Sequence, residues 1–116
     1  MDKFAEHLNN LWDIDESERQ KGIKLLHRIC GNILKDPSNR KFRDLNFVKI
    51  GKRFDHCQPA LLLLFGAGFT ISADTERLQL EANELTINNI RNLQSALSAK
   101  QLGQFQANDT KTKVSE

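Results

Sequence analysis

One long amphipathic segment, residues 18–35, constrains the fold of this chain more than any other feature. Seven apolar residues recur along it at helical spacing and form one broad stripe: Ile23, Leu25, Leu26, Ile29, Cys30, Ile33 and Leu34. A stripe of this width has to be covered by several neighbouring elements, so the segment is predicted to be a central helix. Asp36-Pro37 is predicted to end it, because the residue before a proline is pushed out of the helical region.

Shorter periodic segments around this helix predict four further helices and three strands. The helices are expected at residues 2–13, at 47–54, from Pro59 to Gly66, and from an N-cap at Asn83 to about Lys100. The strands are expected at residues 40–46, 69–72 and 77–81, the last two as a hairpin. Gly66 and Gly68 stand where a left-handed backbone would end a helix. The predicted fold is α+β, mostly helical, with about five helices and a small three-stranded antiparallel sheet.

The length of 116 residues fits one domain, and a hydrophobic content of 39% is enough for a single core. We expect residues 17–102 to form this domain, with residues 1–16 as a helical extension before it. Residues 103–116 are almost free of apolar side chains. They are therefore predicted to be a disordered linker.

The chain carries no sequence signal for a membrane span or for secretion. Its longest apolar run, Ala60 to Phe65, is far below the roughly 20 residues that cross a bilayer. The first residues are acidic and polar, without the apolar core of a signal peptide. Two cysteines, Cys30 and Cys57, do not make a disulfide framework in a reducing compartment. A monomeric protein of the cytoplasm or nucleus is expected.

The sequence offers no convincing catalytic group. Cys30 lies in the apolar stripe, where burial would raise its thiol pKa, and a nucleophilic cysteine needs a lowered one. Cys57 has His56 beside it, but neighbouring side chains on a chain usually point apart. Gly66-Ala67-Gly68 follows a predicted helix instead of preceding one, so its amides are not placed to hold a phosphate. No enzymatic activity is expected of this chain.

A metal site and a cofactor site are also not expected. His27 and Cys30 are three residues apart and could share one helix face, with His56 and Cys57 completing a tetrahedral set. This spacing is not that of a zinc finger, and two consecutive ligands strain the geometry. A packed cysteine and a surface histidine are the simpler interpretation.

Positive charge is concentrated in residues 40–53, which contain six cations and one anion, Asp44. Such a segment predicts an acidic partner: nucleic acid, a lipid headgroup or an acidic peptide. Phe42, Phe47 and Phe54 alternate with these cations, as aromatic side chains do in single-strand nucleic-acid binding. Phe47 and Phe54 are better explained as core residues at helical spacing, so nucleic acid is not the expected partner.

Three fragments, taken in order, resemble a known family. They are Asn32-Ile33-Leu34 with Lys35-Asp36-Pro37, then Lys41-Phe42-Arg43, then Ala60 to Phe65 running into Gly68-Phe69. Their order and spacing resemble the PUB domain, which occurs in peptide:N-glycanase and in some UBX-containing adaptors. The similarity spans about Ser17 to Lys100. A start close to Met1 favours a glycanase-like parent, whose transglutaminase-like catalytic domain would lie beyond Glu116.

The resemblance implies a partner and a set of site residues. PUB domains bind the acidic C-terminal tail of the hexameric AAA ATPase called valosin-containing protein, so this chain would act in ER-associated degradation of misfolded glycoproteins. Asn32 would hold the peptide backbone or a tyrosine hydroxyl, and Phe42 would wall the pocket. Helix capping by Asn32 and core packing by Phe42 remain the alternatives. A basic rim would steer the acidic tail: Lys41, Arg43, Lys49 and Lys52.

Two positions of the predicted site depart from the family pattern. Asn46 stands where members often have an arginine, and Lys49 stands where they have an asparagine. Loss of that arginine removes a charge-assisted contact, worth roughly 1.5–3 kcal/mol elsewhere. Lys49 could replace the cation from a neighbouring turn. Otherwise this chain would bind the tail weakly, or bind a different partner.

Overall fold

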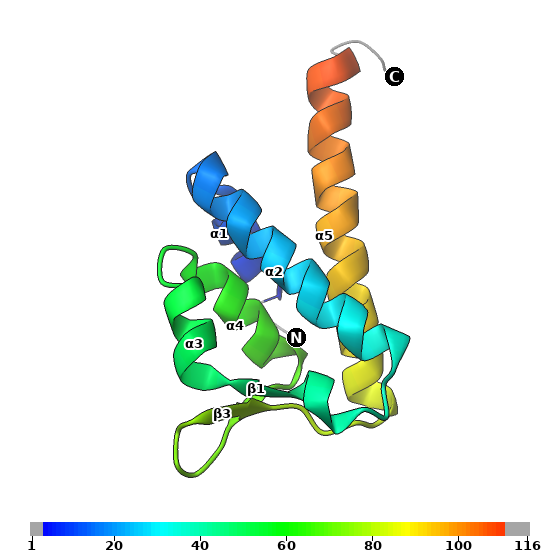
Figure 1. Ribbon diagram of the computed structural model, residues 1–116. Helices are drawn as coiled ribbons and strands as arrows, with labels where there is room; N and C mark the ends of the chain where they lie inside the picture. Colours follow the sequence, from blue (N-terminus) through cyan, green and yellow to red (C-terminus); the bar gives the residue numbers. More distant parts are fainter. Residues whose placement is uncertain (1–3, 111–116) are drawn as a thin grey trace.

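The fold is α+β and mostly helical, as predicted, with five helices and a three-stranded antiparallel sheet (Figure 1). This computed structural model describes the backbone of residues 4–110 and the side chains of residues 4–100. The helices are α1 (Phe4–Trp12), α2 (Glu16–Lys35), α3 (Phe47–Arg53), α4 (Gln58–Ala67) and α5 (Glu84–Thr110). The remaining elements are a 3-10 turn, η1 (Arg40–Arg43), and strands β1 (Asp44–Asn46), β2 (Thr70–Ile71) and β3 (Arg77–Gln79).

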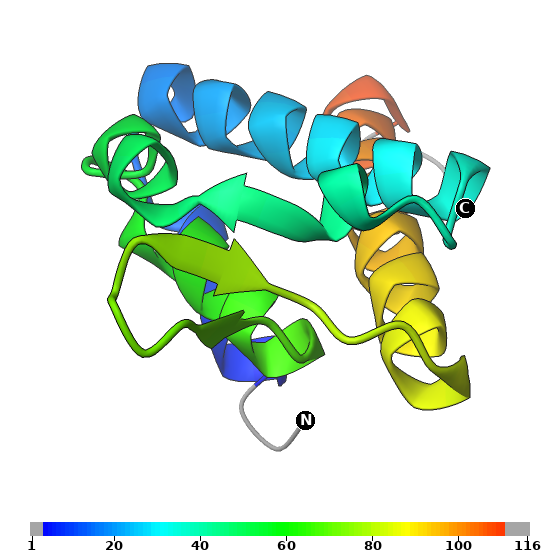
Figure 2. The ribbon, with the colours of Figure 1, turned by 60° about the horizontal axis from the view of Figure 1, so that its bottom comes forward.

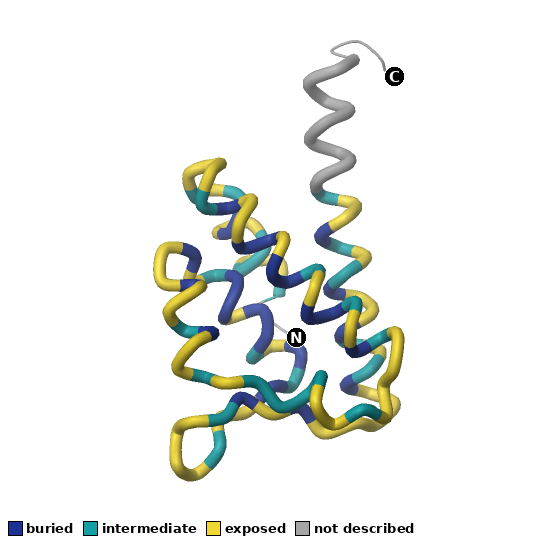
Figure 3. Tube along the Cα trace, in the orientation of Figure 1, coloured by how far each residue is buried: buried dark blue, intermediate teal, exposed yellow. Residues whose placement is uncertain are grey.

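The core lies between α2 and the elements packed around it (Figure 3). α2 contacts α1, α4, α5 and η1, and the predicted stripe is buried except for Leu34, which is partly exposed. α4 supplies the apolar run that the sequence places at residues 60–65, and α5 contributes Ile90, Leu93 and Leu97. The broad stripe of α2 is thus explained by the helices that it contacts.

α1 belongs to this core. Leu11 is fully buried, and α1 packs on α4. The helical extension predicted at residues 1–16 thus packs on the domain within residues 4–16, where α1 shields part of α4 from water.

The sheet has the order β1-β3-β2 and is antiparallel throughout. Its register pairs Leu45 with Leu78, and Leu78 with Ile71. Side chains alternate between the faces of a strand, so the face that carries Leu78 and the partly buried Leu45 lies toward the core, and Ile71 at the edge of the same row is exposed. Leu78 is fully buried, which fixes the register of the hairpin.

Capping side chains mark the starts of α2 and α5, and Asn83 is the N-cap predicted for the latter. Asp15 accepts a hydrogen bond from the Ser17 amide at the start of α2, and Asn83 accepts one from the Thr86 amide at the start of α5. Gly68 ends α4 with φ of 124°, a conformation that costs other residues about 1 kcal/mol or more. Gly66 remains inside α4, so only Gly68 takes the predicted left-handed role.

The hairpin turn between β2 and β3 is held by Asp74. Its Oδ1 accepts hydrogen bonds from the Ser72 hydroxyl and from the Glu76 amide, and these bonds lower the pKa of the Asp74 carboxyl. Thr75 follows with φ of 59°, a strained value for a β-branched residue. The turn therefore depends on local side-chain bonds more than on backbone preference.

Two boundaries differ most from the sequence prediction. Residues 40–43 form η1 in place of the first half of a strand, because Asn39 accepts hydrogen bonds from the Lys41 amide and, through its carbonyl, from the Phe42 amide. α5 continues to Thr110, although a linker is predicted from residue 103. The rest of that linker, residues 111–116, lies outside the described residues.

Within residues 4–110, no helix combines the length and apolarity needed to cross a membrane.

Candidate functional site

Asn32 lies in the last turn of α2 with its side chain exposed. Its backbone carbonyl accepts the hydrogen bond from the Asp36 amide that closes the helix, at 3.2 Å. Its side-chain amide makes no hydrogen bond to another described residue. The backbone of Asn32 therefore takes part in the C-cap, while the side chain is available to a ligand.

Phe42 lies in η1, which turns back along the end of α2 after a connection of residues 36–39 (Figure 2). The ring is partly buried against the core. Part of the ring thus packs inward, and part remains at the surface, on an element that contacts α2.

Arg43, one of the predicted rim cations, is bonded to two backbone carbonyls. Its Nε donates to the Pro37 carbonyl at 2.9 Å, and Nη1 donates to the Leu80 carbonyl at 3.0 Å. The Leu80 amide in turn donates to the Arg43 carbonyl at 2.9 Å. Arg43 therefore fixes η1 to the chain that leaves β3, and its guanidinium is held in one orientation.

Asn46 has a local structural role that the sequence interpretation missed. Its Oδ1 accepts a hydrogen bond from the Lys49 amide at 3.0 Å and so caps α3. The signal was visible, since an asparagine directly before a helical segment is a common N-cap. The same residue remains exposed, so its NH₂ group can still reach a ligand.

The remaining predicted cations are exposed on two elements. Lys41 lies in η1, and Lys49 and Lys52 lie three residues apart on α3. β1 separates η1 from α3, so the cations flank both ends of this strand. Arg40 and Arg53, from the same basic segment, are also exposed. The segment therefore presents positive charge to solvent along its length.

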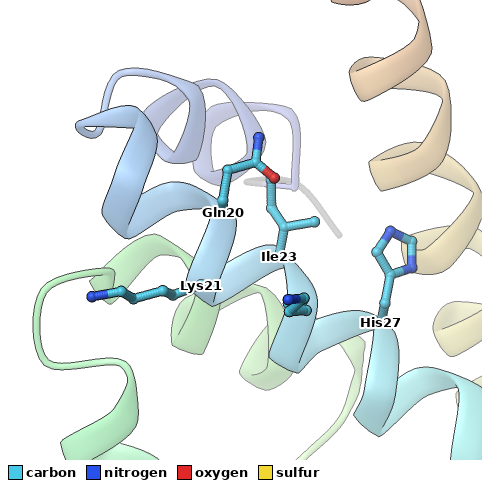
Figure 4. A pocket seen from close by; sticks show the side chains of 5 residues that line it. Gln20, Lys21, Ile23 and His27 are labelled. Carbon is cyan, nitrogen blue, oxygen red and sulfur yellow. The ribbon is translucent and has the colours of Figure 1, made fainter.

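Two cavities lie elsewhere. The smaller, of about 360 Å³, runs along α2, with Lys24 and His27 in its lining; His27 points toward α5 (Figure 4). The larger, of about 570 Å³, has Arg40 and Arg43 in its lining and lies beside the ends of β2 and β3. Neither cavity has Asn32 or Phe42 in its lining, so the pocket predicted from that pair is not one of them.

The cysteines occupy core positions. Cys30 is completely buried, and burial raises the pKa of its thiol to about 12. Cys57 is 3% exposed, and burial raises its pKa as well, whereas His56 beside it is exposed and faces Asp55. Neither thiol is therefore in a setting that stabilises a thiolate.

We expect both thiols to resist alkylation while the protein is folded. A pKa of about 12 leaves on the order of one thiol in ten thousand ionised at pH 8, and burial excludes the reagent. Iodoacetamide labelling followed by mass spectrometry should be at least ~100-fold slower in native buffer than in denaturant. Rapid labelling of Cys57 alone would contradict this and would reopen a reactive role for that residue.

The metal ligands considered from the sequence are separated by burial. Cys30 lies in the core and His56 lies at the surface. Among the described residues, no group of three or more histidine, cysteine or acidic side chains is placed to hold a metal ion.

Comparisons with known proteins do not assign the chain to a family. A scan against protein-family models found no match, and a search of curated proteins found no significant match.

Proposed function

We propose that this chain is a non-catalytic adaptor domain that binds the acidic C-terminal tail of the valosin-containing AAA ATPase, as PUB domains do. The observation that carries the proposal is the set of exposed cations on η1 and α3, which flank β1, together with the contact between η1 and α2, on whose last turn the exposed Asn32 lies. The mostly helical α+β fold with a three-stranded sheet agrees with the resemblance.

The physical basis is charge attraction combined with a small anchored contact. Lys41, Lys49 and Lys52 would attract an acidic tail over several ångströms and raise its association rate. A peptide of a few residues with one or two buried anchors binds at about micromolar strength, near −8 kcal/mol. Binding to a hexamer would raise the effective strength further through avidity.

The parent protein under this proposal is a cytosolic peptide:N-glycanase, with the domain as its N-terminal adaptor. The domain would work as a monomer in the cytoplasm or nucleus and would bring the deglycosylating enzyme to the ATPase. That function needs no metal, cofactor or membrane, since a peptide contact and a covalent link to the enzyme are sufficient.

The test is a titration of the isotope-labelled protein with a synthetic tail peptide, followed by NMR. We expect chemical shifts to change at Asn32, Phe42 and Lys49, with an affinity in the micromolar range. Asn32→Ala should weaken the peptide several-fold while the melting temperature stays almost unchanged, because the Asn32 side chain makes no bond within the described residues.

Two results would count against the proposal. Unchanged spectra at millimolar peptide would reject tail binding. A large loss of stability in Asn32→Ala would support a purely structural role for that residue.

A rival function is binding of nucleic acid or an anionic membrane surface, favoured by the five exposed cations of residues 40–53. It predicts affinity for any polyanion with a steep salt dependence.

A further inference from the structure

The larger cavity lies on the outward face of the sheet, beside the ends of β2 and β3. The register aligns Asp44, Gln79 and Thr70 in one row across the three strands, and this row alternates with the buried row that contains Leu78. All three residues line the cavity, whose volume is about 570 Å³. Pockets that bind ligands commonly have volumes of roughly 300–1,000 Å³. The space is therefore adequate for several residues of an extended peptide.

Arg43 enters this cavity with its orientation already fixed. Two of its N–H groups are bonded to the carbonyls of Pro37 and Leu80, at 2.9 and 3.0 Å. A guanidinium carries more donors than these two bonds use, and the others have no described partner. A planar group of fixed orientation loses little entropy when it binds a carboxylate, which favours recognition over simple attraction.

The charges around the cavity leave a positive surplus. Asp44 is already paired with Arg77, whose Nε lies 2.9 Å from Oδ1, and the Asp44 carbonyl accepts a second bond from that arginine. Arg40 is exposed and has no described side-chain partner. Glu81 is the other carboxylate in the lining, and it is likewise unpaired among the described residues. Two cations thus face one uncompensated anion.

We propose that this cavity binds the carboxylate side chains of an acidic peptide, with Arg43 as the fixed receptor and Arg40 as the second cation. Gln79 and Thr70 offer polar groups to the peptide backbone from the same row. The inference rests on the proposed function and adds to it a second contact, separate from the one at Asn32 and Phe42.

The first test locates the contact. In an NMR titration with the acidic tail peptide, we expect shifts at the Gln79 side-chain amide and at the backbone amides of Thr70 and Ala82. A peptide with its acidic residues replaced by Asn and Gln should lose these shifts. Inorganic phosphate at the same ionic strength should not reproduce them, since a free anion lacks the backbone that Gln79 and Thr70 would contact.

The second test uses charge variants that leave the fold intact. Arg40→Glu should weaken binding of the acidic peptide about tenfold, because a cation of the cavity becomes an anion. The fold should stay intact, because the Arg40 side chain has no partner among the described residues. Arg53→Glu is the matched control: it makes the same charge change in the same basic segment but outside the cavity lining. It should weaken binding by only about twofold, through long-range steering.

Glu81→Gln gives a result that misfolding cannot imitate. Removal of the unpaired carboxylate should raise the affinity for the acidic peptide about threefold, because one repulsive charge is lost. Added salt should reduce this increase in affinity by screening the charges. Arg43→Lys retains the charge but loses the two carbonyl bonds, so it is interpreted only alongside a melting curve.

The outcomes separate this inference from the proposed function. Shifts at Asn32 and Phe42 with equal affinities for Arg40→Glu and Arg53→Glu would overturn the cavity and leave tail binding intact. Shifts confined to the cavity, with Asn32→Ala unaffected, would support the cavity and overturn the contact at Asn32. Absence of any shift with the peptide would overturn both.

Discussion

Gly22→Ala is expected to lower the melting temperature by roughly 10 °C, although alanine usually stabilises a helix interior by about 0.5–1 kcal/mol relative to glycine. At this position a Cβ atom would lie 2.5 Å from the Cys57 Sγ and 3.3 Å from the Cys57 Cβ. Both residues are buried where α2 meets α4, so neither can move into solvent. Overpacking of this kind costs about 1–3 kcal/mol.

Gly51→Ala is the matched control, because nothing lies within 4 Å of a Cβ built at that position of α3. It should be neutral or stabilising by about 0.5–1 kcal/mol. Thermal melts followed by circular dichroism measure both variants. Cys57→Ala should restore part of the stability lost in Gly22→Ala, since the Sγ clash disappears while the 3.3 Å contact remains. Equal stability of Gly22→Ala and Gly51→Ala would show that α2 and α4 have room to separate.

Gly22 illustrates what the sequence can and cannot predict about this fold. The apolar stripe of residues 18–35 identifies α2 as central, because periodicity records which face is buried. The stripe does not predict which other helix packs against it. Only the packed structure places Cys57 against Gly22, and a glycine inside a helix pattern has no sequence signal that explains it.

The basic segment was predicted less completely than the helices. Its positive charge follows directly from composition, and most of its cations are exposed as expected. The exception is Arg43, whose bond to the Leu80 carbonyl joins residues 37 positions apart. A contact of that range depends on the register of β1 with β3, which three-residue strands do not specify in sequence. The cavity beside Arg43 escaped prediction for the same reason, since three separate segments line it.

Local bonds account for the other difference in this region. The short, mixed pattern at residues 40–46 is compatible with an edge strand, but the Asn39 side chain accepts a bond from the Lys41 amide and turns the chain. Short polar side chains commonly divert the backbone in this way. The strand therefore starts only at Asp44. This turn brings Phe42 back toward α2, which the proposed contact with a peptide requires.

Arg19→Ala is expected to destabilise the protein by about 2–3 kcal/mol, through the junction of α1 and α2. Arg19 is 8% exposed, and its Nη1 donates to the carbonyls of Trp12 and Ile14 at 3.2 and 3.3 Å. Two bonds from a charged donor contribute roughly 3–6 kcal/mol, and the buried, unpaired Nε of Arg19 offsets about 1–3 kcal/mol of this, so the midpoints of the two ranges leave about 2–3 kcal/mol. The remainder holds the end of α1 against α2.

The guanidinium of Arg19 also lies 5.7 Å from the centre of the Trp12 ring, and a double-mutant cycle separates this cation–π contact from the carbonyl bonds. Trp12→Leu keeps the Trp12 backbone carbonyl, so Arg19→Ala should still cost most of its effect in that background. Arg28→Ala, at an exposed position of the same helix, should change stability by less than about 0.5 kcal/mol. Chemical denaturation gives the free energies of unfolding of the parent protein, the two single variants and the double variant of this cycle, and that of Arg28→Ala. If Arg19→Met proves as stable as the parent protein, burial of the charge must cost as much as its bonds contribute, and apolar contacts alone hold α1 in place.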